Sequence, residues 1–173
     1  MRMALSIAAA CLAMTVAAGA ESTNAFFAFC MDTHDAKKRN LQEQADLLKE
    51  LCYDGCGHLW LDQVEGRLKT LDAAGLKLFQ IYLSVNVSPG AKQPYDQRLK
   101  DVLPLLKGRN VQIALLLQGA KSSDPSLDPH VSELVRGIAA MADTNGVRIV
   151  LYPHSTDWIE TVADAIRVAE KVD

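Results

Sequence analysis

The stretch KLFQIYLSV, residues 77–85, decides the fold prediction. Side chains of a strand alternate between the two faces of a sheet, so this strand and the following Asn86 divide into two sets. One set is apolar and the other mostly polar: Phe79, Ile81, Leu83 and Val85 against Gln80, Tyr82, Ser84 and Asn86. A strand covered by helices on both faces would be apolar throughout. The pattern therefore predicts one face against helices and the other toward a polar interior.

The same unit recurs along the chain, because each apolar run is followed by apolar residues at helical spacing. The expected strands are residues 25–31, 57–61, 77–85, 111–117 and 147–152, and the expected helices are 41–52, 64–71, 99–106, 131–141 and 158–166. Pro104 is expected to kink or break the third helix. Asp128 is expected to cap the fourth helix, with Pro129 in its first turn, and Ser155 or Thr156 to cap the fifth.

Five βα units in succession predict an α/β fold with parallel strands and helices packed outside. The polar faces favour five units of a (βα)8 TIM barrel, with aliphatic side chains toward the helices and polar ones toward the lumen. A complete barrel takes about 250 residues, so the chain would be truncated by about 100. The alternative is a doubly wound five-stranded sheet, which a chain of this length would fill.

Composition limits the classes of function. The 173 residues are 49% hydrophobic and 23% charged, with a net charge of −3, which indicates a globular domain and no basic face for nucleic acid. Arg2, an apolar run and Ala18-Gly19-Ala20 describe a secretory signal peptide over residues 1–20, so export is expected, with no membrane span in the rest. The mature domain, residues 21–173, then keeps Cys30, Cys52 and Cys56, of which the last two could pair or stay idle.

Two stretches carry a resemblance to a known family. LCYDGCGHLWLDQVEGRLKTLDAAGLKLFQIYLSVNV, residues 51–87, resembles the turn, second strand, helix and third strand of the xylose isomerase-like TIM barrels, the sugar phosphate isomerases and epimerases. VRIVLYPHSTDWIET, residues 147–161, resembles the fifth strand and following loop of exported members of that group. The resemblance implies that small sugars or polyols are isomerised by proton transfer next to a carbonyl.

The resemblance also implies a divalent metal, Mg²⁺, Mn²⁺ or Zn²⁺, held by Glu, Asp, His and Glu at the ends of strands five to eight. Three of those positions would fall beyond the fifth unit, and Tyr152 stands where the first Glu is expected. Tyr is a poor ligand for the harder of these cations, which prefer carboxylate oxygens. We therefore assign no metal ligand in this chain and expect little catalysis from it alone.

Six residues are the candidates for the substrate side. His154 and Tyr152 follow strand five, where barrel loops carry chemistry, so a general base and a hydrogen-bond donor are the roles considered. His58 and Trp60 are expected on the inward face of strand two, for bonding and stacking a sugar. Asn86 and Gln118 end strands three and four, and an amide suits hydroxyl recognition. Each could instead be structural: a bonded loop His, a barrel-top Tyr, a core His–Trp pair, and turn or loop amides.

Other readings stay open. Asp32, His34 and Asp35 follow strand one as DTHD and could suggest a metal cluster, or Asp32 could bond its own turn while the others are solvated. The function could be that of a non-catalytic carbohydrate-binding barrel, or of a small doubly wound ligand-binding domain. A half-barrel would leave an open strand edge, through which copies could associate.

Overall fold

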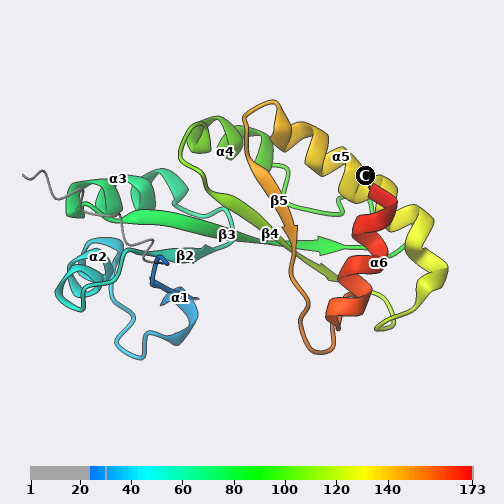
Figure 1. Cartoon of the computed structure of the whole chain (residues 1–173), viewed down its shortest axis with the longest axis horizontal. Coiled ribbons are helices and arrows are strands. Elements are labelled where there is room, and N and C mark those ends of the chain that lie inside the picture. The colour runs from blue at the N-terminus through cyan, green and yellow to red at the C-terminus, as the bar shows by residue number, and fades with distance from the viewer. Residues whose placement is uncertain (1–23, 30, 173) are drawn as a thin grey trace, which may run out of the picture.

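The computed structural model describes residues 24–29 and 31–172 as one parallel five-stranded sheet with helices between the strands (Figure 1). The predicted signal peptide, residues 1–20, and Cys30 lie outside the described residues. The strands are β1 Phe27–Ala28, β2 Gly55–Leu59, β3 Lys77–Asn86, β4 Gln112–Gln118 and β5 Arg148–Leu151. The helices are α1 Met31–His34, α2 Leu41–Glu50, α3 Val64–Ala74, α4 Leu99–Leu106, the 3₁₀ turn η1 Pro125–Leu127, α5 Asp128–Asp143 and α6 Val162–Val172.

The order of the strands decides between the two predicted architectures. The strands lie in sequence order, β1-β2-β3-β4-β5, and every neighbouring pair is parallel. A doubly wound sheet reverses its strand order at a switch point, whereas a TIM barrel advances by one strand at each crossover. The barrel prediction is therefore confirmed and the doubly wound alternative is wrong. Among the described residues, β1 and β5 form the two edges of the sheet.

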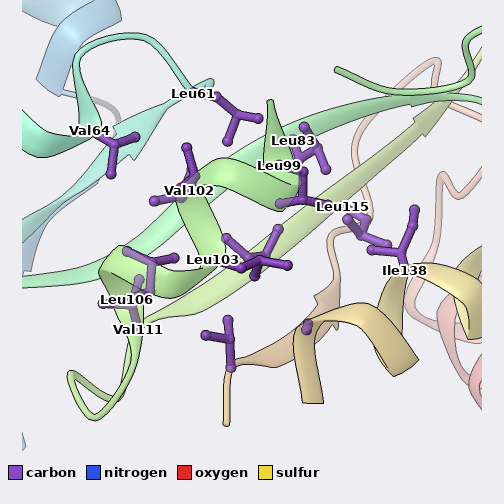
Figure 2. Close-up of a cluster of buried hydrophobic side chains, with 14 of the residues drawn as sticks. Leu61, Val64, Leu83, Leu99, Val102, Leu103, Leu106, Val111, Leu115 and Ile138 are labelled. Carbon is purple, nitrogen blue, oxygen red and sulfur yellow. The ribbon is translucent and has the colours of Figure 1, made fainter. Parts of the chain in front are cut away.

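The core lies between the sheet and the helices, as the period of β3 and β4 predicts. Ile81, Leu83 and Val85 of β3 are buried there with Ile113, Leu115 and Leu117 of β4. Figure 2 shows the α4 side chains Leu99, Val102, Leu103 and Leu106 beside Leu83 and Leu115. Burying a Leu of this kind stabilises the fold by about 2 kcal/mol, so these layers fix the sheet that carries the polar face.

A register shift between β2 and β3 changes the predicted face of one β3 position. Cys56 pairs with Leu78 but Gly57 pairs with Gln80, so Phe79 is the extra residue of a bulge. Leu78 takes the buried place expected for Phe79, and the Phe79 ring stacks on Phe27 with 4.8 Å between centroids. Beyond the bulge, Ile81, Leu83 and Val85 keep the face that was predicted for them.

Three helix predictions also need correction. Helix α4 runs through Pro104 and ends two residues later, so the proline lies in the last turn. Asp128 is the first residue of α5 and does not cap it; its carboxylate accepts from Arg167 and Lys171 at 3.1 and 3.0 Å. Helix α6 begins at Val162, after the expected start at Trp158.

The start of α6 is fixed by a residue the sequence pattern passed over. The Thr161 hydroxyl accepts from the backbone N–H of Asp164 at 3.2 Å, and the Asp164 carboxylate accepts from the N–H of Thr161 at 2.9 Å. This reciprocal pair is a capping box, which neither Ser155 nor Thr156 provides. Trp158, fully buried in the preceding loop, donates its indole N–H to the carbonyl of Asp124 at 3.1 Å.

No helix in the described part of the chain has both the length and the apolar character needed to cross a bilayer.

Candidate functional site

A cavity of about 360 Å³ opens where the carboxyl ends of β2 and β3 meet. It is lined by three segments: Trp60, Leu61 and Asp62 after β2; Leu83, Ser84 and Asn86 at the end of β3; and Gln93, Pro94, Tyr95, Asp96 and Arg98 before α4. Chemistry in TIM barrels sits at this edge of the sheet. A larger cavity of about 540 Å³ lies beside β5 and α5, but mainly apolar side chains at the open edge of the sheet line it.

The backbone builds the cavity by folding two loops toward each other. Trp60 leaves β2 in a left-handed conformation, φ 62°, while its N–H donates to the carbonyl of Tyr82 at 3.1 Å. The loop after β3 returns to the same strand, because the N–H of Asn86 donates to the carbonyl of Pro94 at 2.7 Å. Non-glycine residues take positive φ at a cost, so the turn at Trp60 is maintained by its surroundings.

His58 lies on the opposite face from the one predicted. Its register partner is Ile81, a core residue, so the imidazole is buried among the helices and does not line the cavity. Its Nε2 lies 2.7 Å from the carbonyl oxygen of Asp62. This contact holds the loop that carries Trp60. In β2 the buried Cys56 lies two residues before His58 on the same face, and the left-handed turn at Trp60 breaks the alternation that would place His58 and Trp60 together.

Beneath the cavity, Asp32 and Arg67 form a charged pair that the sequence pattern did not indicate. Arg67 is fully buried on α3 and donates from Nη2 to Asp32 Oδ1 at 2.5 Å and to Gln44 Oε1 at 2.6 Å. Asp32 Oδ2 also lies 3.1 Å from His58 Nδ1. Burial alone would raise the pKa of Asp32, but the His58 hydrogen bond and the Arg67 charge lower it to about 2.

The DTHD stretch therefore has a structural role for both of its aspartates. Asp32 reaches across to His58 and Arg67, and it is Asp35 that bonds its own turn, accepting from the N–H groups of Lys37 and Arg39 at 3.1 and 2.8 Å. The expectation that Asp32 bonds its own turn is wrong. The separation of Asp32 and Arg67 by 35 residues explains why local spacing could not reveal the pair.

Gln118 lies beside the cavity and links three elements. Its Oε1 accepts from the Ser84 hydroxyl at 3.0 Å, and its Nε2 donates to Asp157 Oδ2 at 3.3 Å. Both ends of the amide are thus engaged by the protein, which makes Gln118 a support for the cavity-lining Ser84. Asp157, nearly buried in the loop after β5, was missed because nothing in a loop sequence marks which side chain turns inward.

His154 and Tyr152 lie across β4 from the cavity and do not line it. The His154 side chain is 54% exposed, and its Nδ1 lies 3.0 Å from the carbonyl of Ser155 and 3.9 Å from Asp157 Oδ2. The Tyr152 ring packs against Tyr82 and Phe29, with centroids 5.6 and 5.9 Å away. Of the six candidates, the structure brings only Trp60 and Asn86 into one cavity.

Comparison with known proteins supports the barrel fold through solved structures alone. No protein-family model matches the sequence, and no curated protein matches it. Solved structures do match, among them a xylose isomerase-like TIM barrel protein of Mycobacterium smegmatis in complex with magnesium (18% identity, TM-score 0.60, 86% of this chain and 61% of that chain). The fold is that of a partial TIM barrel with five βα units in sequence order.

Two further structures share this partial barrel. One is a D-psicose 3-epimerase of Clostridium cellulolyticum with D-tagatose (16% identity, TM-score 0.62, 87% of this chain and 60% of that chain). The other is the IOLI protein with a bound zinc atom (16%, 0.66, 86% and 59%). The chain spans about 60% of the length of the structures it matches.

The residues of this partial barrel do not fit the metal that the resemblance implies. Within residues 24–29 and 31–172, no three His, Cys, Asp or Glu side chains come together as ligands. The residue that follows β5 is Tyr152, whose ring packs among aromatic rings, so no carboxylate lies at that position.

Cys52 and Cys56 are not paired with each other. Cys52 is exposed, and burial raises the pKa of Cys56 to about 11.

Proposed function

We propose that the cavity at the ends of β2 and β3 binds a small carbohydrate or polyol. The observation that carries this is the Trp60 indole, which lines the cavity while remaining 40% exposed. A large aromatic ring on an open cavity wall is a surface on which the C–H face of a sugar packs. Asn86 and Ser84 on the same wall supply groups that bond hydroxyls.

The orientation of Asn86 supports the same conclusion. Its Oδ1 accepts from the N–H of Ser88 at 3.0 Å, so its amide nitrogen is the group left for a ligand. Ser84 donates to Gln118, so its oxygen still has an acceptor lone pair to offer. A donor and an acceptor in the same cavity as an aromatic ring match the alternating hydroxyls of a sugar.

A second candidate is catalysis by a longer form of the protein, an isomerase or epimerase that moves a proton next to a carbonyl. The exposed imidazole of His154 at the end of β5 favours it, since barrel enzymes place such groups there. The match to an epimerase supports the fold, but it does not show which residues of this chain would be catalytic. We expect residues 21–173 to bind without turning over.

Binding and turnover are separated by one pair of measurements. Isothermal titration with D-tagatose and with myo-inositol tests the cavity, and Trp60→Ala should abolish the heat. Proton NMR of D-tagatose in D₂O with the protein tests exchange at the carbon next to the carbonyl. Heat without exchange supports a binding protein, and exchange that depends on His154 supports an isomerase. If neither heat nor exchange is observed, the proposal is wrong.

We also propose that the protein is exported. The support is the arrangement of Arg2, the apolar run and Ala18-Gly19-Ala20 ahead of Glu21. N-terminal sequencing of the protein recovered outside the cytoplasm should begin at Glu21. Recovery of the intact N-terminus inside the cell would contradict this.

A further inference from the structure

We infer that the cavity selects unphosphorylated sugars and rejects sugar phosphates. This rests on the proposed function and names the ligand class for the same site. Two features of the molecule support it: the charges of the cavity wall, and the Asp96 carboxylate at the start of α4.

Of the described residues that line the cavity, Arg98 is the only cation, and two carboxylates hold it. Its Nη1 donates to Asp62 Oδ1 at 2.8 Å, and its Nε and Nη2 donate to Asp96, at 2.9 Å from Nε to Oδ2. These hydrogen bonds raise the pKa of Arg98 and lower that of Asp96. The wall therefore carries one more negative charge than positive.

Asp96 also occupies the place where a phosphate would bind. The start of a helix attracts anions, because its first N–H groups have no partner inside the helix. In the turn before α4, the Asp96 carboxylate accepts from the backbone N–H of Arg98, the N-cap residue, at 2.9 Å, and the Asp96 carbonyl accepts from the N–H of Leu99 at 3.1 Å. The same carboxylate receives the Arg98 guanidinium. It thus occupies a backbone N–H at the start of α4 and the arginine, two contacts that a phosphate ester would use.

A phosphorylated ligand would have to displace Asp96 or lie beside two carboxylates. The Asp96 side chain is tied to its own helix through three residues of chain, so a free ligand competes at a disadvantage. Asp62 is 65% exposed, but its charge still repels an anion at the mouth of the cavity. A neutral sugar meets neither obstacle and can use the carboxylates as hydroxyl acceptors.

The test compares D-tagatose with D-tagatose 6-phosphate, each titrated calorimetrically into the wild type and into Asp62→Asn/Asp96→Asn. No side-chain hydrogen bond caps α4, and an Asn oxygen at position 96 can still accept from the N–H of Arg98, so the double variant should keep α4. We expect the wild type to prefer the neutral sugar by at least about tenfold and the double variant to lose that preference. Asp62→Asn alone, a change at a largely exposed side chain, should give a partial loss. Asp72→Asn, which removes the partner of Arg109 elsewhere, should change nothing.

Inorganic phosphate separates this inference from the proposed function. Even if no sugar binds the wild type, so that the proposed function fails, phosphate should bind the double variant and not the wild type. A wild type that binds the phosphate ester as tightly as the sugar would overturn the inference. A double variant that gains no affinity for phosphate would overturn it as well.

Discussion

The rings of Tyr82 and Tyr152 meet edge to face across β4, with centroids 5.6 Å apart and planes at 75°. The residue of β4 in register with Tyr82 is Ala114, fully buried, whose methyl group leaves space for the two rings. Aromatic pairs favour this geometry, and the contact joins β3 to the chain just after β5.

A larger residue at position 114 should separate the rings. We expect Ala114→Leu to lower the free energy of unfolding by about 1–3 kcal/mol, because the inserted methylenes have no empty space to fill. Urea unfolding followed by circular dichroism measures this. Ala114→Ser, which adds one atom, serves as the matched control. Equal stability of Ala114→Leu and the wild type would show that the rings do not pack as described.

The pair of Asp32 and Arg67 should make stability depend on pH. The pKa of Asp32 is about 2 in the folded protein and 3.8 for a free carboxyl, so its contribution is present above pH 3.8 and is lost as the pH falls through about 2. We expect Asp32→Asn to cost about 2 kcal/mol at pH 6 and progressively less toward pH 2. Urea titrations at pH 6, 4 and 2.5 give the difference. A gap that does not change with pH would contradict an ionised, paired Asp32.

The hydrogen bond that Asp157 accepts from Gln118 should stabilise the fold independently of the charge of Asp157. Asp157→Ala leaves the amide nitrogen of Gln118 without its acceptor, and we expect a loss of about 1–3 kcal/mol in unfolding free energy. Asp157→Asn keeps an acceptor oxygen and should recover most of that loss. Thermal unfolding of both variants checks the order. If the two variants are equally unstable, the charge and not the hydrogen bond is what stabilises the loop.

Exposed apolar side chains near β1 should promote self-association. Phe26 is 63% exposed beside the edge strand, and an unpaired strand edge is a template for contact between copies. We expect Phe26→Ser to lower the apparent mass in sedimentation equilibrium, whereas Leu105→Ser, a 39% exposed residue on α4, should not. A wild type that remains monomeric at every concentration would contradict this.

The sequence predicts the fold well because the faces of β3 and β4 in the structure match the period-two alternation of the sequence. Ile81, Leu83, Ile113 and Leu115 lie on the helix side for the reason that the pattern gives. Prediction fails where one extra residue enters a strand. The bulge at Phe79 depends on pairing between β2 and β3, which no local pattern encodes, and it puts Leu78 in the buried place expected for Phe79.

The candidate site was predictable only in part, and for a related reason. Trp60 and Asn86 follow strand ends, so topology brings them to one cavity. Asp96 and Arg98 belong to a loop whose return onto β3 is set by the backbone bond from Asn86 to Pro94. Asp157 is placed by the loop after β5. Contacts between loops depend on the assembled sheet and leave no periodic signal in the chain.

The proposed function depends on a sugar packing on Trp60, and tryptophan fluorescence can report that contact. The chain contains two tryptophans, and Trp158 is fully buried while Trp60 is 40% exposed, so acrylamide should quench Trp60 selectively. We expect D-tagatose or myo-inositol to protect the Trp60 fluorescence from acrylamide in a saturable way, and Trp60→Phe to abolish the effect. Quenching that no neutral sugar alters at any concentration, in a correctly folded protein, would contradict it.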